Sequence, residues 1–220
     1  TRRQLQGTGA DRLESQVHME RSRRCPYGEC SGGHLACPEG AMAKVSMVIT
    51  FPDRALCKAS AVPRSLLGKR VLDVGGYDGR MASLALERGA ASAIVVENGQ
   101  FRSYQGYPDV QMPPGVGLWE GDILSCELPA EVVFCFDVLY HVKAPYLLAE
   151  KLYELTQEVL CLSTRIVAGP DDYWRLYQPR EQHQNDPTVC WKPTLGSLRK
   201  LLTIVGFQEG WDSYTEMPGV

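Results

Sequence analysis

The stretch that decides the fold is VLDVGGYDGRMASLALERGAASAIVVEN, residues 71–98. It opens with an apolar run typical of a buried strand, turns at a group of glycines, continues through a helix-length segment and ends with a second apolar run. A strand, a tight turn and a helix that lead to another strand are typical of a βαβ unit in a parallel sheet. In an open α/β sheet, this first turn lies where ligands bind, outside the carboxyl ends of the strands.

Further apolar runs alternate with helix-length segments along the chain. The runs read RVLDVG, SAIVVEN, VGLWEGDIL, EVVFCFDVLYH and VLCLSTRIV, and helices are expected at residues 81–88, 146–155 and 195–202. Strands that are apolar throughout are typical of a parallel sheet that helices cover on both faces. The sequence therefore predicts an α/β fold with a doubly wound, mostly parallel, Rossmann-like sheet.

Composition narrows the class of protein. A chain of 220 residues, 44% of them hydrophobic, can bury one sizeable core, which excludes a disordered chain and a disulfide-stapled miniprotein. No apolar run approaches the roughly 18 residues of a membrane span, and no signal-peptide pattern is present. Because Cys57, Cys126, Cys135 and Cys161 lie in a chain of this size, several of them inside apolar runs, we expect buried, reduced thiols and a soluble, cytoplasmic protein without a membrane partner.

Two segments depart from the strand and helix pattern. Residues 1–43 mix Arg, Gly, Ser and Cys without periodicity, and we expect a basic, poorly ordered N-terminal arm before a domain at residues 44–220. Cys25, Cys30, His34 and Cys37 in this arm leave structural zinc and free thiols both open, but their spacing departs from the C-x2-C pairs of zinc sites, so no metal is predicted. Residues 168–194 are rich in Pro, Asp, Gln and aromatic residues, and a connection of this length predicts a lid-like insertion.

The glycine turn predicts a nucleoside site. Gly75, Gly76 and Gly79 permit a tight bend and the close approach of a ligand, although a turn that merely needs positive φ explains them as well. Asp73 precedes them inside the strand, and Glu97 ends the next strand, about 20 residues further on, where an acid reaches ribose hydroxyls. Together, Asp73 and Glu97 favour a nucleoside site over a turn that merely needs positive φ.

Phosphate-bearing ligands fit this turn less well. Tyr77 stands where a dinucleotide-binding G-x-G-x-x-G motif has its second glycine, and no Gly-Lys-Ser/Thr of a phosphate-binding loop follows. An NAD-dependent enzyme is therefore a disfavoured alternative, and an adenosine without phosphates is the expected ligand.

These motifs together resemble a known family. VLDVGGYDG, the acid at position 97, GDIL at residues 121–124 and FDVLYH at residues 136–141 are similar to the successive motifs of class I S-adenosylmethionine-dependent methyltransferases. VLYH, DPTVCWKPT and LLTIVGF resemble the branch that includes the tRNA wobble-uridine carboxymethyl- and methyltransferases. The resemblance runs from about residue 67 to residue 207. The family usually ends in an antiparallel pair of strands, and because only a short segment follows Gly206 the last strand is expected to be missing or rebuilt.

The resemblance implies S-adenosyl-L-methionine as the cofactor and assigns its contacts. The carboxylate of Asp73 lies near the ammonium group, Glu97 takes the ribose hydroxyls, and Asp122 and Ile123 flank the adenine. The full implied set is Asp73, Gly75, Gly76, Gly79, Glu97, Asn98, Asp122, Ile123 and Phe136.

Methyl transfer is a direct displacement, so the protein must align the reactants and exclude water. An O–H nucleophile also benefits from a base, and His141, expected at the end of a strand, is the candidate; the alternative is a histidine that only shapes the site through a hydrogen bond. Tyr177, Trp191 and Lys192 of the 168–194 insertion predict the acceptor side, or else a lid that packs on its own aromatic residues and carries solvated charges. Tyr140 is expected to touch the donor or the acceptor, or else simply to pack.

The leading interpretation is a methyltransferase that acts on an O or N nucleophile of a small or unknown acceptor. The alternative is a tRNA wobble-uridine enzyme, since an Arg-rich start is able to hold phosphates. The relatives that modify tRNA use a carboxylated donor, and their additional basic and Trp positions find no match here. A second alternative is a non-catalytic cofactor-binding module. The oligomeric state stays open.

Overall fold

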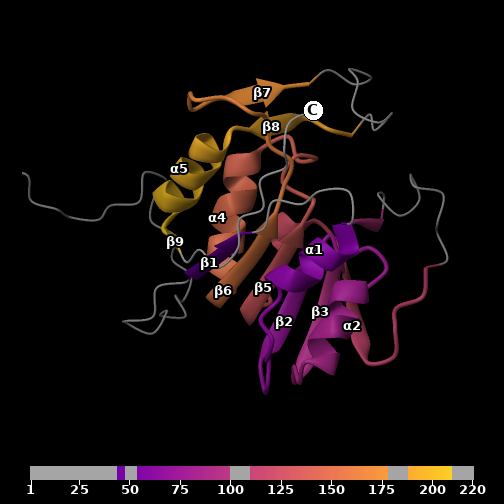
Figure 1. Cartoon of the computed structure of the whole chain (residues 1–220). Coiled ribbons are helices and arrows are strands. Elements are labelled where there is room, and N and C mark those ends of the chain that lie inside the picture. The colour runs from indigo at the N-terminus through magenta and orange to yellow at the C-terminus, as the bar shows by residue number, and fades with distance from the viewer. Residues whose placement is uncertain (1–43, 48–53, 100–109, 178–187, 210–220) are drawn as a thin grey trace, which may run out of the picture. The chain divides into compact units, whose positions relative to one another are not determined.

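The computed structural model describes residues 44–47, 54–99, 110–177 and 188–209 (Figure 1). The predicted arm at residues 1–43, with its cysteines, lies outside the described residues, and so do residues 210–220. No helix in the described ranges has both the length and the apolar character needed to cross a membrane.

A parallel sheet forms the centre of the domain. Its strand order is β4-β3-β2-β5-β6-β1-β9, and every pair of neighbours in it is parallel. The strands are β1 (Lys44–Met47), β2 (Arg70–Val74), β3 (Ser92–Glu97), β4 (Val116–Glu120), β5 (Ala130–Phe136), β6 (Thr156–Ser163) and β9 (Gln208–Glu209). The five strands from β2 to β6 are the five that the apolar runs predicted, and the α/β, doubly wound class is confirmed.

The far edge of the sheet was not predicted. Strand β1 lies between β6 and β9, with Val45 opposite both Leu160 and Glu209. The strand that follows the last helix therefore pairs over two residues in parallel, so the described part of this edge differs from the antiparallel pair that usually ends the family's sheet, one of the two outcomes that were expected. Both strands are too short for a periodicity that a sequence reading would detect.

Helices cover both faces of the sheet (Figure 1). They are α1 (Arg54–Ala61), α2 (Arg80–Glu87), α4 (Pro145–Leu155) and α5 (Leu195–Val205). Three of them match the predicted helices to within a few residues, and α1 was not predicted. Thr194 caps the start of helix α5, with its Oγ1 accepting a hydrogen bond from the Ser197 amide at 3.3 Å, and Gly206, with φ 113°, caps its end. These are the usual start and stop residues of a helix.

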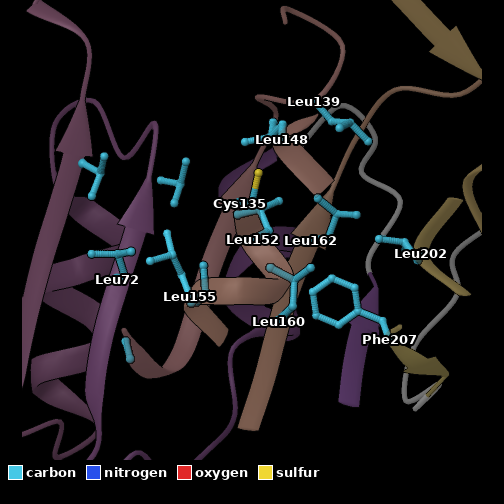
Figure 2. Packing of buried hydrophobic residues seen from close by; sticks show 14 of the residues in the cluster. Leu72, Cys135, Leu139, Leu148, Leu152, Leu155, Leu160, Leu162, Leu202 and Phe207 are labelled. Carbon is cyan, nitrogen blue, oxygen red and sulfur yellow. The ribbon is translucent and has the colours of Figure 1, made fainter. Parts of the chain in front are cut away.

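Alternation along the strands separates two cores. Leu72 on β2 belongs, with Leu152 of α4 and Leu202 of α5, to the core on one face (Figure 2). Val71, the preceding residue, belongs with Ala85 of α2 to the core on the opposite face. Because successive side chains of a strand point to opposite faces, strands that are apolar throughout bury both sides.

Cys126, Cys135 and Cys161 are buried free thiols, as the sequence predicted. Burial raises the pKa of the Cys161 thiol to about 12, so the thiol stays protonated at neutral pH. The side chain of Cys57 lies outside the described residues.

A small hairpin lies between β6 and α5 in the chain. Strands β7 (Trp174–Leu176) and β8 (Trp191–Pro193) pair in antiparallel fashion. The amides of Cys190 and Trp191 donate to the carbonyl of Tyr140 at 2.8 and 3.3 Å, which seats this segment on the loop after β5. The described part of the 168–194 insertion is therefore folded against the carboxyl end of the sheet.

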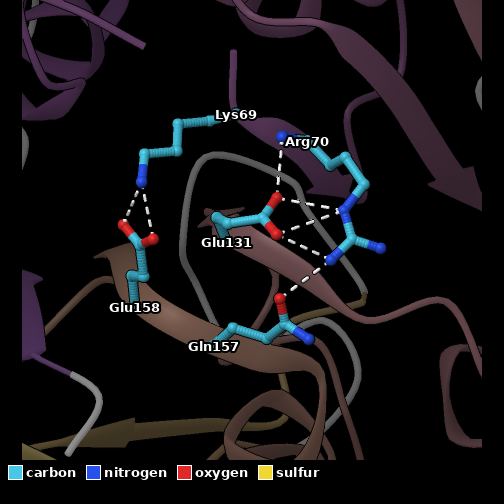
Figure 3. A network of polar contacts seen from close by, with 5 residues as sticks. All are labelled: Lys69, Arg70, Glu131, Gln157 and Glu158. Atoms are coloured by element: carbon cyan, nitrogen blue, oxygen red, sulfur yellow. Dashed lines mark hydrogen bonds and ion pairs between the residues drawn. The ribbon is translucent and has the colours of Figure 1, made fainter. Parts of the chain in front are cut away.

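Polar contacts tie the opposite, amino ends of the strands together (Figure 3). The guanidinium of Arg70 at the start of β2 donates to both carboxylate oxygens of Glu131 on β5, with the shortest N–O distance 2.7 Å, and to Gln157 Oε1 on β6 at 2.8 Å. Lys69 pairs with Glu158 on β6 at 2.6 Å. The Arg70 guanidinium holds the pKa of Glu131 down at about 2. This end of the sheet is held by ion pairs, whereas the carboxyl end carries the cavities described next.

Candidate active site

The glycine turn after β2 has a backbone that requires glycine. Gly75 has φ 68°, and a Cβ added there would overlap Cγ2 of Val138. A Cβ on Gly76 would lie 2.5 Å from Oδ2 of Asp73. Tyr77 also has positive φ, 49°, and its amide donates to Oε2 of Glu97 at 3.1 Å. The tyrosine thus adopts a left-handed conformation that usually falls to glycine, and the amide contact with Glu97 anchors the loop there.

Asp73 lies beneath this turn with one oxygen unsatisfied. The residue is 1% exposed, and its Oδ2 has no hydrogen-bond partner among the described residues. Burial raises the pKa of Asp73 to about 7, while the positive charge of Lys58 acts in the opposite direction. A buried carboxylate oxygen without a hydrogen bond is costly, and a cationic ligand group would offset that cost.

Asp73 opens onto a small cavity of about 230 Å³. Its lining includes Lys58 of α1, Arg80 and Phe136. Lys58 Nζ lies 2.9 Å from Oδ2 of Asp137, which has a left-handed φ of 62° directly after β5. The ion pair therefore fixes the point at which the chain leaves β5.

A large cavity of about 550 Å³ lies on the other side of Gly75, which lines both spaces. Its volume falls in the range of small-molecule sites. The predicted cofactor and catalytic residues that line it are Gly75, Glu97, Asn98, Asp122, Ile123 and His141, and the others include Val74, Val96, Leu124, Asp137, Val138 and Lys143. The cavity combines apolar walls with a few acidic groups at the carboxyl ends of β3 and β4.

The two acids of this cavity are held in place by backbone amides. Glu97, 4% exposed, accepts from the amides of Tyr77 and Asn98, the latter at 3.0 Å. Asp122 accepts from the amide of Leu124 at 3.0 Å and so caps the short 3₁₀ helix η1 (Ile123–Ser125). A carboxylate oxygen accepts more than one hydrogen bond, so both groups keep capacity for ligand hydroxyl or amino protons.

The sequence predicted His141 at the end of a strand, but in the structure this residue lies in a turn. Strand β5 stops at Phe136, and the His141 amide donates to the carbonyl of Val138 at 2.9 Å. The reason is the left-handed residue Asp137, which ends the extended run. The imidazole lines the large cavity, and its Nδ1 lies 2.7 Å from Oγ1 of Thr188.

The four predicted acceptor-side residues gather beside the large cavity without lining it. Tyr140 and Tyr177 are buried together with Val189. Trp191 Nε1 donates to the carbonyl of Lys143 at 3.2 Å, and Lys192 lies with its Nζ 4.8 Å from the centre of the Tyr177 ring. The ring of Tyr140 contacts that of His141, with centroids 4.2 Å apart, and so joins this group to the cavity.

The predicted cofactor residues divide between the two cavities. Glu97, Asn98, Asp122 and Ile123 line the large one; Asp73, Gly76 and Phe136 line the small one, and Gly75 lines both. Gly79 lines neither: it is buried, and a Cβ there would lie 2.9 Å from Cδ of Pro113. Its role in this structure is to let the turn enter α2 against a neighbouring loop.

Sequence reasoning did not single out three residues of the site. Asp137 and Thr188 lie inside motifs that carried the family resemblance, so that resemblance was a signal for their segments without giving their roles. Lys58 gave no signal, because its helix was not predicted and its partner lies far along the chain.

Residues 50–209, most of the chain, match a family model described as a methyltransferase domain. The chain belongs to the methyltransferase domain family. The fold of this methyltransferase domain resembles that of an S-adenosylmethionine-dependent methyltransferase from Mesorhizobium loti, with a TM-score of 0.51 at 17% identity over 70% of this chain and 80% of that one. The predictions of a class I fold and of a methyltransferase domain are confirmed.

Similar sequences place the methyltransferase domain near one branch of the family. The tRNA U34 carboxymethyltransferases of Pseudomonas putida (strain W619) and of Pseudomonas savastanoi pv. phaseolicola (strain 1448A / Race 6) are each 31% identical over 156 residues, which is 66% of this chain and 47% of the relative. The predicted resemblance to the wobble-uridine branch is confirmed. The chain spans about half the length of these relatives.

The residues of the site fit the cofactor. The unpartnered oxygen of Asp73 suits an ammonium group, and the glycine turn leaves space where any side chain at position 75 would collide with Val138. Glu97 offers carboxylate lone pairs to hydroxyl groups at the end of β3, and apolar residues such as Ile123 provide a surface for a planar ring.

Proposed function

We propose that the methyltransferase domain transfers a methyl group from S-adenosylmethionine to an O or N nucleophile of a small acceptor. The observation that carries this proposal is that His141 lines the same cavity as Glu97 and Asp122. One space thus holds carboxylates suited to a nucleoside and an imidazole suited to accept a proton.

Four residues hold the cofactor in this proposal. Asp73 accepts from the ammonium group, Glu97 from the ribose hydroxyls and Asp122 from the adenine amino group, while Ile123 packs on the ring. When bound, S-adenosylmethionine supplies a methyl group on a sulfonium, which a nucleophile displaces directly. The protein contributes alignment, because a positioned nucleophile reacts far faster than one that must be found by diffusion.

His141 acts as the base toward a hydroxyl acceptor. In this role Nδ1 carries a proton and donates a hydrogen bond to Oγ1 of Thr188, which leaves the other ring nitrogen to take the proton that the acceptor oxygen loses as its bond to the methyl carbon forms. The tautomer is a requirement of this role. The ring of Tyr140, tilted by 47° to the imidazole with centroids 4.2 Å apart, packs beside it and limits its rotation.

The insertion at residues 168–194 closes the acceptor side in this proposal. Its described part is held on the loop after β5 by the amides of Cys190 and Trp191 and by the indole of Trp191. Covering that loop excludes water from the reacting atoms and shields them from competing hydrolysis.

A second candidate is modification of the tRNA wobble uridine. The names of the relatives that are 31% identical favour it. In that case the Arg-rich segment at residues 1–43 holds tRNA phosphates, and the binding falls steeply with salt.

The test begins with binding and proceeds to transfer. Calorimetric titration with S-adenosylhomocysteine is expected to show saturable binding that Glu97→Ala removes. The chain is then incubated with S-adenosylmethionine tritiated in its methyl group, with a small-molecule extract in one arm and total tRNA in another, and a further tRNA arm uses the carboxylated donor.

Each arm decides between candidates. Label in the small-molecule fraction that His141→Gln reduces supports the proposed function. Label or carboxymethyl groups in tRNA replace it with the second candidate. Binding without transfer in every arm identifies a non-catalytic module, and no binding by the folded chain contradicts the cofactor assignment as well.

A further inference from the structure

Three cationic side chains converge beside the acceptor side of the methyltransferase domain. Arg175 of β7 and Lys192 of β8 are directly opposite each other in the hairpin. The Arg175 guanidinium carbon and the Lys192 ammonium nitrogen lie 5.1 and 4.8 Å from the centre of the Tyr177 ring. The guanidinium carbon of Arg165, a residue that follows β6, lies 5.1 Å from the centre of the Tyr140 ring. Tyr140 and Tyr177 belong to one buried cluster. Arg165, Arg175 and Lys192 are called the cation cluster below.

Lys192 is the unusual member of the cation cluster. The residue is only 4% exposed. Within the described part of the chain, no carboxylate pairs with Lys192 or with Arg175, whereas the exposed Lys200 on α5 pairs with Asp172. Lysine is rarely buried without a partner, because removing an ammonium group from water is costly.

The aromatic rings compensate only in part. A cation over the face of an aromatic ring gains roughly 0.5–2 kcal/mol, which is less than the desolvation cost of a buried charge and does nothing against the repulsion between like charges. Burial and the charges of Arg165 and Arg175 together lower the pKa of Lys192 to about 8. A bound anion would relieve both the burial and the repulsion.

The location of the cation cluster indicates that the anion belongs to the acceptor. The Tyr140 ring that lies under Arg165 also contacts the imidazole of His141. The indole of Trp191, next to Lys192, donates a hydrogen bond to the carbonyl of Lys143, a residue that lines the large cavity. The cation cluster therefore borders the place where a group of the acceptor enters.

We infer that Lys192, Arg175 and Arg165 form a binding site for an oxyanion, a carboxylate or a phosphate group, carried by the small acceptor. Guanidinium groups bind such oxyanions in a bidentate manner, and an ammonium group adds a point charge. This inference deepens the proposed function and rests on it. The acceptor is then an anionic molecule that presents its nucleophile to His141.

The first experiment measures the titration of Lys192 with and without an oxyanion. The full chain is labelled with ¹³C-lysine, and the Lys192 signal is assigned by its absence from Lys192→Arg. The pKa of Lys192 is expected to be higher in sodium phosphate or sodium acetate than in sodium chloride of equal ionic strength, because a bound oxyanion stabilises the ammonium form. Comparison of the phosphate and acetate arms shows which oxyanion the site prefers.

An unchanged Lys192 pKa overturns the inference. The inference is also overturned if the pKa of Lys192 in sodium chloride already equals the ordinary lysine value. In that case carboxylates of the chain itself, such as Glu181 or Asp186, neutralise the cation cluster. Lys200 serves as the internal control, because it is exposed and already paired with Asp172. The Lys200 signal is expected to be unaffected by the choice of anion.

The second experiment uses variants that keep the fold and the cofactor site intact. Arg175 is exposed, so Arg175→Gln is expected to fold, and it should weaken phosphate or acetate binding by at least about tenfold, as loss of a charged hydrogen bond does. Lys200→Gln is the matched control and should bind the oxyanion as the unmodified chain does. Equal oxyanion affinity in both variants overturns the inference.

Binding of S-adenosylhomocysteine separates the two levels of proposal. Variants that retain it but lose the oxyanion support the inference. If the unmodified chain binds S-adenosylhomocysteine but no oxyanion, the oxyanion site is contradicted and the proposed function is unaffected. If Arg175→Gln weakens the binding of tRNA more than that of acetate and phosphate, the occupant is RNA and the small anionic acceptor is excluded.

Discussion

Nδ1 of His141 lies 2.7 Å from Oγ1 of Thr188, so a residue just before strand β8 holds the imidazole at the rim of the large cavity. The contact joins the loop after β5 to the segment that covers it. A hydroxyl at position 188 can donate to Nδ1 or accept from its N–H, so the contact couples the tautomer of the imidazole to the orientation of the hydroxyl.

Thr188→Val is expected to leave His141 in a mixture of tautomers, because the isosteric valine offers no hydrogen-bond partner. Thr188→Ser keeps the hydroxyl and should keep a single tautomer. Nitrogen-15 shifts of His141 measure this without knowledge of the acceptor. Identical tautomer populations in all three proteins would show that Thr188 does not orient the ring.

Asp73 predicts a pH dependence of cofactor binding. Its folded-state pKa of about 7 means that the carboxyl is mostly protonated at pH 6 and mostly ionised at pH 8. Only the ionised form attracts an ammonium group, so S-adenosylhomocysteine should bind about tenfold more weakly at pH 6 than at pH 8. A bound cation lowers the pKa of Asp73, and binding near pH 6 should therefore release protons.

The control for this prediction is Asp73→Asn, which keeps the shape of the side chain and does not titrate. Its affinity should be low and independent of pH between 6 and 8. Calorimetry in two buffers of different ionisation enthalpy counts the protons released. A pH dependence that persists in Asp73→Asn would assign it to another group.

Gly75→Ala is expected to destabilise the domain by about 2–4 kcal/mol, from the positive φ together with the overlap between the new methyl group and Val138. Gly68→Ala is a matched control, since Gly68 has φ 71° with nothing within 4 Å of an added Cβ. It should show only the conformational part, about 1 kcal/mol. Adding Val138→Ala to Gly75→Ala should recover the steric part, and urea unfolding measures all four proteins. Equal losses for the two glycine variants would mean that the contact with Val138 is unimportant.

The Arg70–Glu131 pair predicts a stability term that depends on acid. Because the folded-state pKa of Glu131 is about 2, below its ordinary value, the stabilisation is complete above about pH 4.5 and is lost as the pH falls toward 2. Arg70→Met should therefore lower the free energy of unfolding at pH 7 by only about 1 kcal/mol, since Arg70 is half exposed, and by much less at pH 2.5.

Lys69→Met tests the neighbouring pair, whose partners are both more than a third exposed. It should change stability by no more than about 0.5 kcal/mol. A loss as large as that of Arg70→Met would show that the bidentate geometry in Figure 3 adds nothing.

The central sheet was predictable because its strands are long apolar runs punctuated by glycine and charged residues. Helix α5 was predictable as well, since apolar residues recur at helical spacing after Thr194 and stop at Gly206. Strand β1, with four residues, and β9, with two, fall below the length at which periodicity is informative. Their place in the sheet is decided by tertiary pairing.

The residues of the site divide in the same way, into those that the sequence predicts and those that only the folded chain brings together. Glu97 was predictable from its position at the end of an apolar run, because the carboxyl ends of parallel strands meet at one edge, and Asp122 was predicted through the family resemblance. The Lys58–Asp137 pair and the contact between His141 and Thr188 join segments far apart in the sequence. No spacing rule along a chain predicts such pairs, which depend on where the loops lie once the sheet has formed.

The pairing of β1 with β6 and β9 has a consequence for how the chain folds during synthesis. The ribosome releases β1 before all the other described strands, but its partners are among the last to emerge. Until residues 156–163 have left the exit tunnel, β1 has no neighbour, and its second edge stays open until residues 208–209 follow. Closing so long a loop is slow, so the sheet between β2 and β6 assembles first and the amino-terminal strand is added late.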